Sequence, residues 1–198
     1  MLLAACLSIP GSAQSSASPA KTRSSPHPIG IVKFFVAPAT TGYDTGPLHI
    51  VYADGTTSVQ RLPPLKKDTP HETFANAVGF AEVHLAKDGR TLGWEILFQN
   101  CCTSYSIPES VVVFRDKRVM HEFQQGQMVR SWMFADGGDR IAIVFGTVHG
   151  PEVGDYRLYD VSTGKLLSEV WGDEETQALK TDAPEWAKRL EDQLHNKP

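Results

Sequence analysis

The sequence lacks the features that mark several large classes of protein. No apolar run approaches the roughly 20 residues that a transmembrane helix needs, so no transmembrane segment is predicted. Lys and Arg total 19 against 23 Asp and Glu, for a net charge of −4. Binding to a phosphate backbone requires a basic footprint, and this balance gives none, so nucleic acid is not an expected partner.

Familiar catalytic motifs are also lacking. The chain has no Gly-x-Ser-x-Gly nucleophile elbow, no Gly-x-x-x-x-Gly-Lys phosphate loop and no Gly-x-Gly-x-x-Gly dinucleotide fingerprint. The pairs His71-Glu72 and His121-Glu122 each lack the second histidine of a zinc-protease helix. We therefore predict no cofactor, and the interpretation leans away from an enzyme.

The N-terminus indicates a compartment. An apolar run, Leu2–Ile9, is followed by small residues, and no charged side chain precedes Lys21. This pattern is typical of the back half of a signal peptide. We predict a signal peptide over 1–13, truncated at its start, and a disordered linker rich in Ser, Ala and Pro over 14–29.

A second interpretation of the N-terminus involves Cys6. The segment LAAC that ends at Cys6 resembles a bacterial lipoprotein processing box, which would make Cys6 a lipid-bearing N-terminus. Six residues are too few for the usual leader, so cleavage near Ala13 is preferred over a lipid anchor and over a cytosolic tail. We therefore predict a secreted or periplasmic protein of the bacterial cell envelope.

Cysteine is scarce, with three in the chain, and two of them are adjacent. In an exported protein Cys101 and Cys102 would be oxidised, with only each other as partners. Their Cα atoms would lie ~3.8 Å apart, closer than the ~4.4–6.8 Å of an ordinary disulfide, so a bond would force a tight turn. We predict a vicinal disulfide that stiffens the loop 99–110, with Tyr105 as a neighbouring contact residue. Two buried thiols or a cross-link to another chain are the alternatives.

Alternation of apolar and polar residues, typical of half-buried strands, runs from Ile31 to Trp171. Turns that contain Asp, Gly or both interrupt it, as expected for antiparallel hairpins, at 54–55, 88–89, 116–117, 136–139 and 162–164. Counting outward from the 88–89 turn sets three apolar pairs on one face: Leu85 with Leu92, Val83 with Trp94, and Ala81 with Ile96.

Two segments look like copies of one unit. Residues 81–123 and 130–171 each hold two hairpins joined by a loop, about 48 positions apart, and the stretch before residue 62 fits a partial third unit. After them, Trp186, Leu190 and Leu194 recur every fourth residue.

That spacing predicts a helix of about a dozen residues, with Asp182 as its N-cap. Packing of its apolar stripe on the last sheet is favoured over the binding of a partner.

The segments FADGGDRIAIVFG and DYRLYDVSTGKLLSE resemble a blade of the WD-repeat and related β-propeller families. In such blades an Asp/Gly turn precedes an apolar strand, and a second hairpin closes the sheet. The resemblance covers about 40 residues well and is weaker over 81–123. It implies a scaffold for binding more often than a catalyst.

Propellers close with about four or more blades, and this chain holds about two and a half. The predicted fold is therefore all-β: antiparallel meander sheets over 30–172, arranged as an incomplete propeller or a sandwich, with a C-terminal α-helix within 173–198.

One cluster of titratable residues is predicted. The hairpin pairing sets Glu82 opposite Glu95, with His84 on the same face. Like charges about 5 Å apart repel, which raises the pKa of one carboxylate or favours a divalent cation. The simpler interpretation, that both glutamates face water or a neighbouring cation, is preferred.

We expect an exported, non-catalytic binding or scaffold module whose ligand is an unidentified protein or small molecule. The first alternative is a hydrolase or divalent-metal-dependent enzyme that uses Glu82, His84 and Glu95. The second is a structural subunit that completes a propeller by oligomerising.

Overall fold

The structure, a computed structural model, describes residues 29–40, 42–66, 76–100, 104–148, 154–173 and 179–196. The predicted signal peptide and vicinal disulfide lie outside the described residues, as does the predicted linker up to residue 28. The last residue of the predicted linker, Ile29, is described and packs against the core. Nowhere in the described ranges does a helix combine the length and the apolar composition that a bilayer crossing requires.

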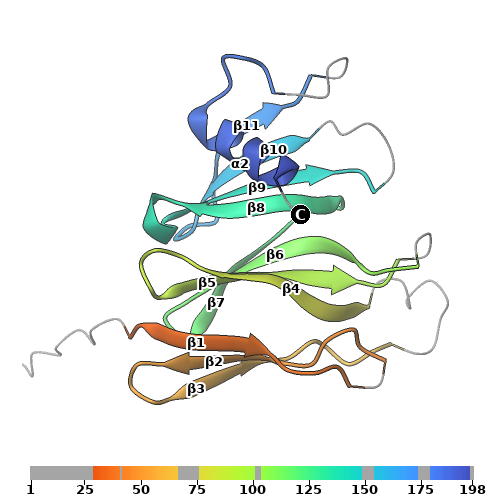
Figure 1. The fold of residues 1–198 in the computed structure, drawn as a ribbon, viewed down its shortest axis with the longest axis vertical. Helices are drawn as coiled ribbons and strands as arrows, with labels where there is room; N and C mark the ends of the chain where they lie inside the picture. The colour runs from red at the N-terminus through yellow and green to blue at the C-terminus, as the bar shows by residue number, and fades with distance from the viewer. Residues whose placement is uncertain are drawn as a thin grey trace, which may run out of the picture.

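The described strands form three antiparallel sheets that lie one above another (Figure 1). The first sheet contains β1 (Ile31–Val36), β2 (Leu48–Tyr52) and β3 (Thr57–Gln60). The second sheet contains β4 (Ala77–Leu85), β5 (Thr91–Phe98), β6 (Ile107–Arg115) and β7 (Arg118–Gln124). The third sheet contains β8 (Met128–Ala135), β9 (Arg140–Gly146), β10 (Asp155–Asp160) and β11 (Leu166–Trp171). Strands that are neighbours in sequence pair in every sheet, which confirms the predicted all-β meander fold.

The predicted turns are all present between these strands. The turn between β6 and β7 has only two residues, Asp116 and Lys117, with φ values of 52° and 63°. Positive φ at both positions is the primed geometry that matches the right-handed twist of a hairpin. The turn between β8 and β9 contains a short 3-10 helix, η1 (Asp136–Gly138).

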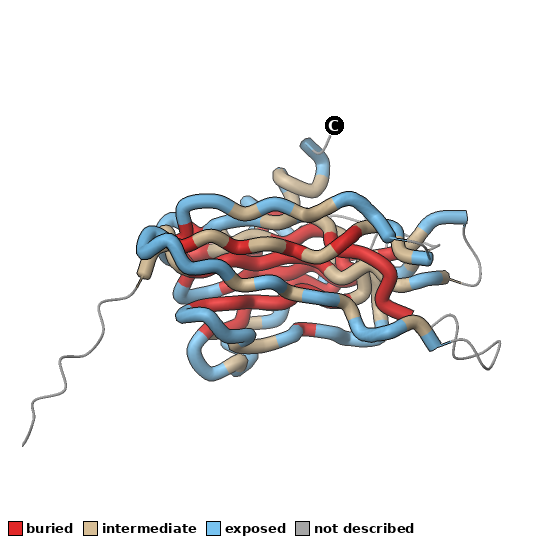
Figure 2. The backbone as a smooth tube through the Cα atoms, turned by 90° about the horizontal axis from the view of Figure 1, so that it is seen from below, coloured by how far each residue is buried: buried red, intermediate tan, exposed pale blue. Residues whose placement is uncertain are grey.

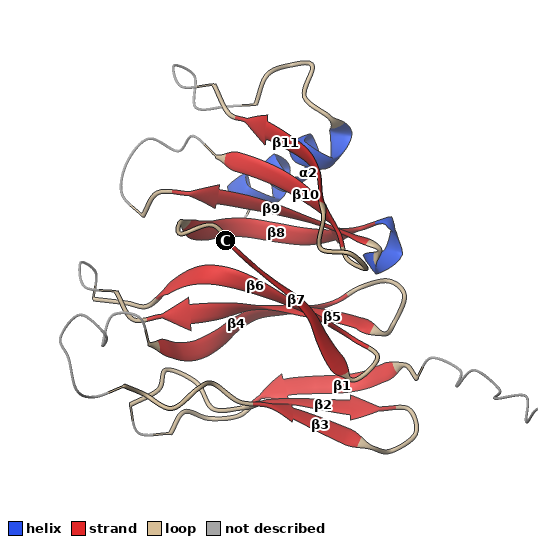
Figure 3. Cartoon of the chain, turned by 180° about the vertical axis from the view of Figure 1, so that it is seen from behind, coloured by secondary structure: helices blue, strands red, loops and turns tan. Residues whose placement is uncertain are grey.

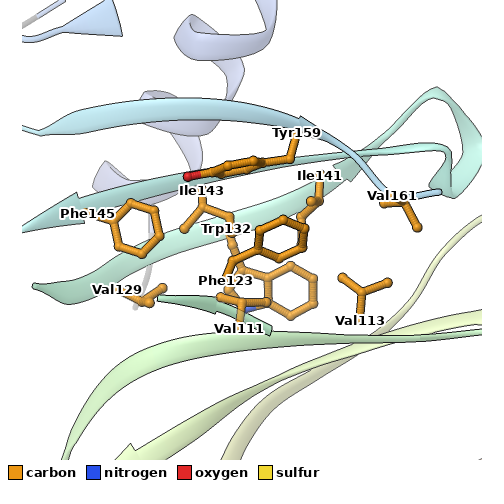
Figure 4. Packing of buried hydrophobic residues seen from close by; sticks show 10 residues of the cluster. All are labelled: Val111, Val113, Phe123, Val129, Trp132, Ile141, Ile143, Phe145, Tyr159 and Val161. Atoms are coloured by element: carbon orange, nitrogen blue, oxygen red, sulfur yellow. The ribbon is translucent and has the colours of Figure 1, made fainter. Parts of the chain in front are cut away.

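Apolar side chains fill the two layers between the three sheets. On β6, Val112 and Phe114 face the first sheet, whereas Val111 and Val113 face the third. Figure 4 shows the second of these layers, in which Val111 and Val113 meet Trp132 and its neighbours. Both faces of the second sheet are therefore buried, which explains why consecutive residues of β6, from Val111 to Phe114, are all apolar. Figure 2 shows the result, with buried positions along the inner strands and exposed ones at the margins.

Gly93 sets the distance between the second and third sheets. A Cβ atom at this position would lie 2.6 Å from Cη2 of Trp132, closer than real side chains approach. The indole ring therefore rests directly on the backbone of β5, and a larger residue would push the sheets apart.

The helix α2 (Glu185–His195) covers the outer face of the third sheet (Figure 3). Ala187 and Leu190 are fully buried there, and Trp186 and Leu194 pack beside them. Packing of the predicted stripe on the last sheet is thus confirmed.

The predicted N-cap of this helix is wrong. Pro184 precedes the first helical residue, and no side chain caps the helix. Asp182 lies in the turn before it. Pro184 holds an extended conformation, with ψ at 148°, so the helix starts only after the proline.

The predicted pairing of β4 with β5 holds only near the turn. Leu85 lies opposite Leu92, but β4 bulges between Ala81 and His84, so Ala81 lies opposite Glu95. A bulge inserts one extra residue and shifts every later pair. The predicted pair of Ala81 with Ile96 is therefore wrong: Phe80 lies opposite Ile96 instead. The predicted one-to-one pair of Val83 with Trp94 is also changed, because two residues of the bulge, Glu82 and Val83, lie opposite the single residue Trp94.

Candidate binding site

The bulge also separates the predicted carboxylate pair. Oε2 of Glu82 lies 3.1 Å from Nε2 of His84, and both side chains are half-exposed. The His84 ring packs edge-on against Trp132, with centroids 5.0 Å apart. Glu95 is buried on β5, with 3% of its surface exposed, and does not face Glu82 across the hairpin.

These three residues do not form a metal centre. Over the described ranges, no three His, Cys, Asp or Glu side chains gather closely enough to hold a metal ion. The contact between Glu82 and His84 instead holds the ring of His84 at the border between the second and third sheets.

A charged cluster, of which Asp155 is buried, lies elsewhere, on β10 and β11. Nη2 of Arg157 lies 2.7 Å from Oδ2 of Asp155 and 2.9 Å from Oε1 of Glu169. The hydrogen bond to Asp155 raises the pKa of Arg157, and burial raises the pKa of Tyr159 beside it. Because the guanidinium lies between two carboxylates, this cluster links β10 to β11 and its cation is already paired.

The two ends of the sheets are built differently. The end that carries the five short turns, here called the tight-turn end, gathers the β2–β3, β4–β5 and β8–β9 turns at the left of Figure 1. The opposite end, here called the long-loop end, carries longer connections, among them 37–47 between β1 and β2 and 99–106 between β5 and β6.

A pocket of about 490 Å³ opens at the long-loop end, between the first and second sheets. We call it the Tyr105 pocket. Its described lining residues are Gly42, Asp44, Val78, Gln99, Asn100, Ser104, Tyr105 and Ser106.

One wall of the Tyr105 pocket is the segment 42–46, which is docked on β4. The backbone N–H groups of Asp44 and Thr45 donate to the carbonyl of Val78, at 2.7 and 3.4 Å. In return the N–H of Phe80 donates to Oγ1 of Thr45 at 2.8 Å. Gly79 permits this close approach, because a Cβ on it would lie 3.3 Å from Cβ of Asp44.

The other wall is held by Asn76, which is buried at the start of β4. Its carbonyl accepts the N–H of Gln99 at 3.0 Å. Its side chain pairs with the backbone of Lys66: Oδ1 accepts the N–H at 2.9 Å and Nδ2 donates to the carbonyl at 3.2 Å. The hydroxyl of Ser106 closes the frame by donating to the carboxylate of Asp44.

The lining is rich in groups that form hydrogen bonds and poor in charge. Asp44 is its one charged residue and Val78 its one aliphatic residue, counted over the described lining. The side chain of Tyr105 is 62% exposed beside these polar groups. Such a lining offers many donors and acceptors for hydrogen bonds to a polar ligand.

A smaller cavity of about 150 Å³ lies beside the same segment, lined by Thr40, Tyr43, Thr45, Gly46, Pro47, Arg61 and Leu62. The hydroxyl of Tyr43 donates to the carbonyl of Pro63 at 3.1 Å and fastens the loop there. The segment 42–46 therefore borders two cavities and is fixed on both sides.

The structure brings one of the predicted site residues, Tyr105, into the pocket. Glu82, His84 and Glu95 are not among its lining residues, and Cys101 and Cys102 lie outside the described residues. The sequence analysis missed Asp44, although its place in a Gly-bordered loop between two strands was a usable signal.

The sequence analysis also missed the polar residues of the β5–β6 connection that line the pocket: Gln99, Asn100, Ser104 and Ser106. The contact of Ser106 with Asp44 spans 62 positions and has no local signature. No protein-family model matches this chain, and a comparison with curated proteins finds no significant match.

Proposed function

We propose that this chain is an exported, non-catalytic binding module of propeller-like type that holds a ligand in the Tyr105 pocket. The observation that carries the proposal is the pocket itself: about 490 Å³ of space at the long-loop end, framed by segments hydrogen-bonded to β4. Small-molecule sites are usually clefts of about 300–1,000 Å³, so the volume fits such a site, and the mainly polar lining favours a polar ligand. The apolar run and small residues at the N-terminus support the export.

The frame of the pocket supports binding without chemistry. Asp44 is the only acid in the described lining, and its carboxylate already accepts the hydroxyl of Ser106. Apart from Asp44 and Tyr105, the described lining holds no titratable side chain, and it has none of the His, Glu or Lys residues that most often transfer protons in catalysis. The walls are braced on a rigid sheet, which lowers the cost of ordering them around a ligand.

A thermal-shift screen of a small-molecule library tests the proposal. Ligands of the pocket should raise the melting temperature of the wild-type protein and leave that of Tyr105→Ala unchanged. The variant itself should alter the free energy of unfolding by less than about 0.5 kcal/mol, because the side chain is exposed.

Trp171→Ala is the matched control, since Trp171 is a similarly exposed aromatic residue on β11 that does not line the pocket. It should respond to each ligand as the wild type does. Ligands whose effect survives Tyr105→Ala, or none at all in a broad library, would contradict the proposal.

A further inference from the structure

The charge of the Tyr105 pocket restricts its ligand. No Lys, Arg or His occurs in the described lining, and Asp44 contributes a negative charge. Phosphate and carboxylate groups are held in proteins by cationic side chains and clustered N–H donors. An anionic ligand would therefore meet repulsion here, and a neutral one would not.

The polarity of the lining restricts the ligand further. The amides of Gln99 and Asn100 each carry donors and an acceptor, and the hydroxyl of Ser104 does both; the hydroxyl of Ser106 donates to Asp44 and keeps its acceptor lone pairs. A ligand that matches such a lining has groups that donate and accept at the same atom, as hydroxyl groups do. A mainly apolar ligand would find only Val78 to pack on and would strip water from the rest.

Tyr105 adds a flat apolar surface to this polar frame. Its side chain is exposed in the pocket lining, and its ring faces offer area that polar groups do not. A ligand with one face of C–H groups and a rim of hydroxyls would satisfy both parts of the site at once.

We infer that the ligand of the Tyr105 pocket is a neutral saccharide of one to two sugar units. A sugar ring has C–H groups for Tyr105 and hydroxyls for Gln99, Asn100 and the two serines. The volume of about 490 Å³ suits a ligand of this size. This inference rests on the proposed function and names its ligand class.

A glycan array probed with the labelled full-length protein tests the inference, with neutral and acidic mono- and disaccharides side by side. Binding is expected on neutral glycans. It should weaken about tenfold or more in Tyr105→Ala, persist in Tyr105→Phe, which keeps the ring, and persist in Trp171→Ala. Calorimetry with the best disaccharide should give the same affinity from about 0.05 to about 0.5 M salt, because screening does not affect a neutral ligand.

The outcomes separate this inference from the proposed function. Binding confined to acidic glycans overturns the saccharide assignment, as does neutral-glycan binding that Tyr105→Ala leaves intact. A non-sugar ligand from the thermal-shift screen that requires Tyr105, with an empty neutral array, overturns the inference and leaves the binding function standing. If neither the thermal-shift screen nor the glycan array finds a ligand that requires Tyr105, both the saccharide inference and the proposed binding function are contradicted.

Discussion

The tight-turn end and the long-loop end are held together in different ways. At the tight-turn end the sheets are joined directly through their backbones: the N–H of Ile31 donates to the carbonyl of Gly89 at 2.8 Å, and the N–H of Asp88 donates to that of Gly137 at 2.9 Å. At the long-loop end the described contacts fasten loops to β4 and leave a pocket between them. One end fixes the stacking of the sheets, and the other carries the proposed binding site, in loops of the kind that commonly bind ligands on a rigid scaffold.

Arg115 is the main side-chain link at the tight-turn end. It is 7% exposed, and its Nε donates to Oγ1 of Thr91 at 2.6 Å. Its Nη2 donates to the carbonyl of Gly138 at 2.5 Å and lies 3.2 Å from Oδ1 of Asp139. A residue of the second sheet thus holds the β8–β9 turn of the third. At the long-loop end the described side-chain links, those of Thr45, Asn76 and Ser106, fasten loops and contain no buried cation.

The largest expected effect is that of Gly138→Ala at the tight-turn end. Gly138 has φ of 121°, and a Cβ there would lie 2.8 Å from Cβ of Ala86. Backbone strain and the clash should together lower the free energy of unfolding by about 3 kcal/mol, measured by urea titration.

Gly126→Ala is the matched control, because Gly126 also has positive φ, at 68°, but open space around it. It should cost only about 1–2 kcal/mol. Equal losses for the two variants would show that the sheets do not depend on close packing at Gly138.

A smaller loss is expected for Arg115→Met, which keeps the length of the side chain and removes its hydrogen bonds. Thr91 and the Gly138 carbonyl would lose their partner, so the free energy of unfolding should fall by about 1.5–3 kcal/mol. Arg118→Met removes the same charge from the exposed position opposite Arg115 on β7 and should cost less than about 0.5 kcal/mol. Ligand binding at the Tyr105 pocket should be unchanged in both, and a loss of binding in Arg115→Met alone would mean that the two ends are coupled.

The smallest effect concerns pH and the turn carboxylates. Hydrogen bonds from Thr56 lower the pKa of Asp54 to about 2, and those from Ser162 and Thr163 lower the pKa of Asp160 to about 2, against an ordinary value of 3.8. A folded-state pKa below the unfolded one gives stability that is complete above the unfolded value. That stability disappears as pH falls from about 4 towards 2.

The melting temperature of wild-type protein should therefore fall over this pH range. It should fall less in Asp160→Asn, which keeps an acceptor oxygen but does not titrate. Asp182→Asn, at an exposed position before α2, serves as the control and should follow the wild type. Parallel curves for wild type and Asp160→Asn would contradict the assignment.

Local chemistry explains which parts of the fold were predictable. Alternating side chains and Asp-containing turns encode hairpins over a few residues, so the strands and turns followed directly. The bulge at Glu82, where φ is 46°, was not predictable, because its surroundings include distant residues: His84 beside it packs against Trp132, 48 positions away in the chain. The start of α2 failed for a local reason: two signals, Asp182 and Pro184, competed and the proline prevailed.

The candidate site was less predictable than the fold. Tyr105 stood out as an aromatic residue in a loop, but Asp44, Gln99 and Ser106 are ordinary polar residues until the loops are brought together. The two walls that carry them are held by Asn76, which binds the backbone of Gln99 and Lys66, and by Gly79, which lets the segment with Asp44 approach β4. These roles appear only when distant segments meet.

By itself the sequence determined the antiparallel meanders, their turns and the apolar stripe of the helix, because these depend on side chains a few positions apart. Only the tertiary structure decided how the sheets stack, where β4 bulges and which polar residues share a pocket. Those outcomes depend on contacts between distant segments, and no short-range pattern records which distant groups will meet.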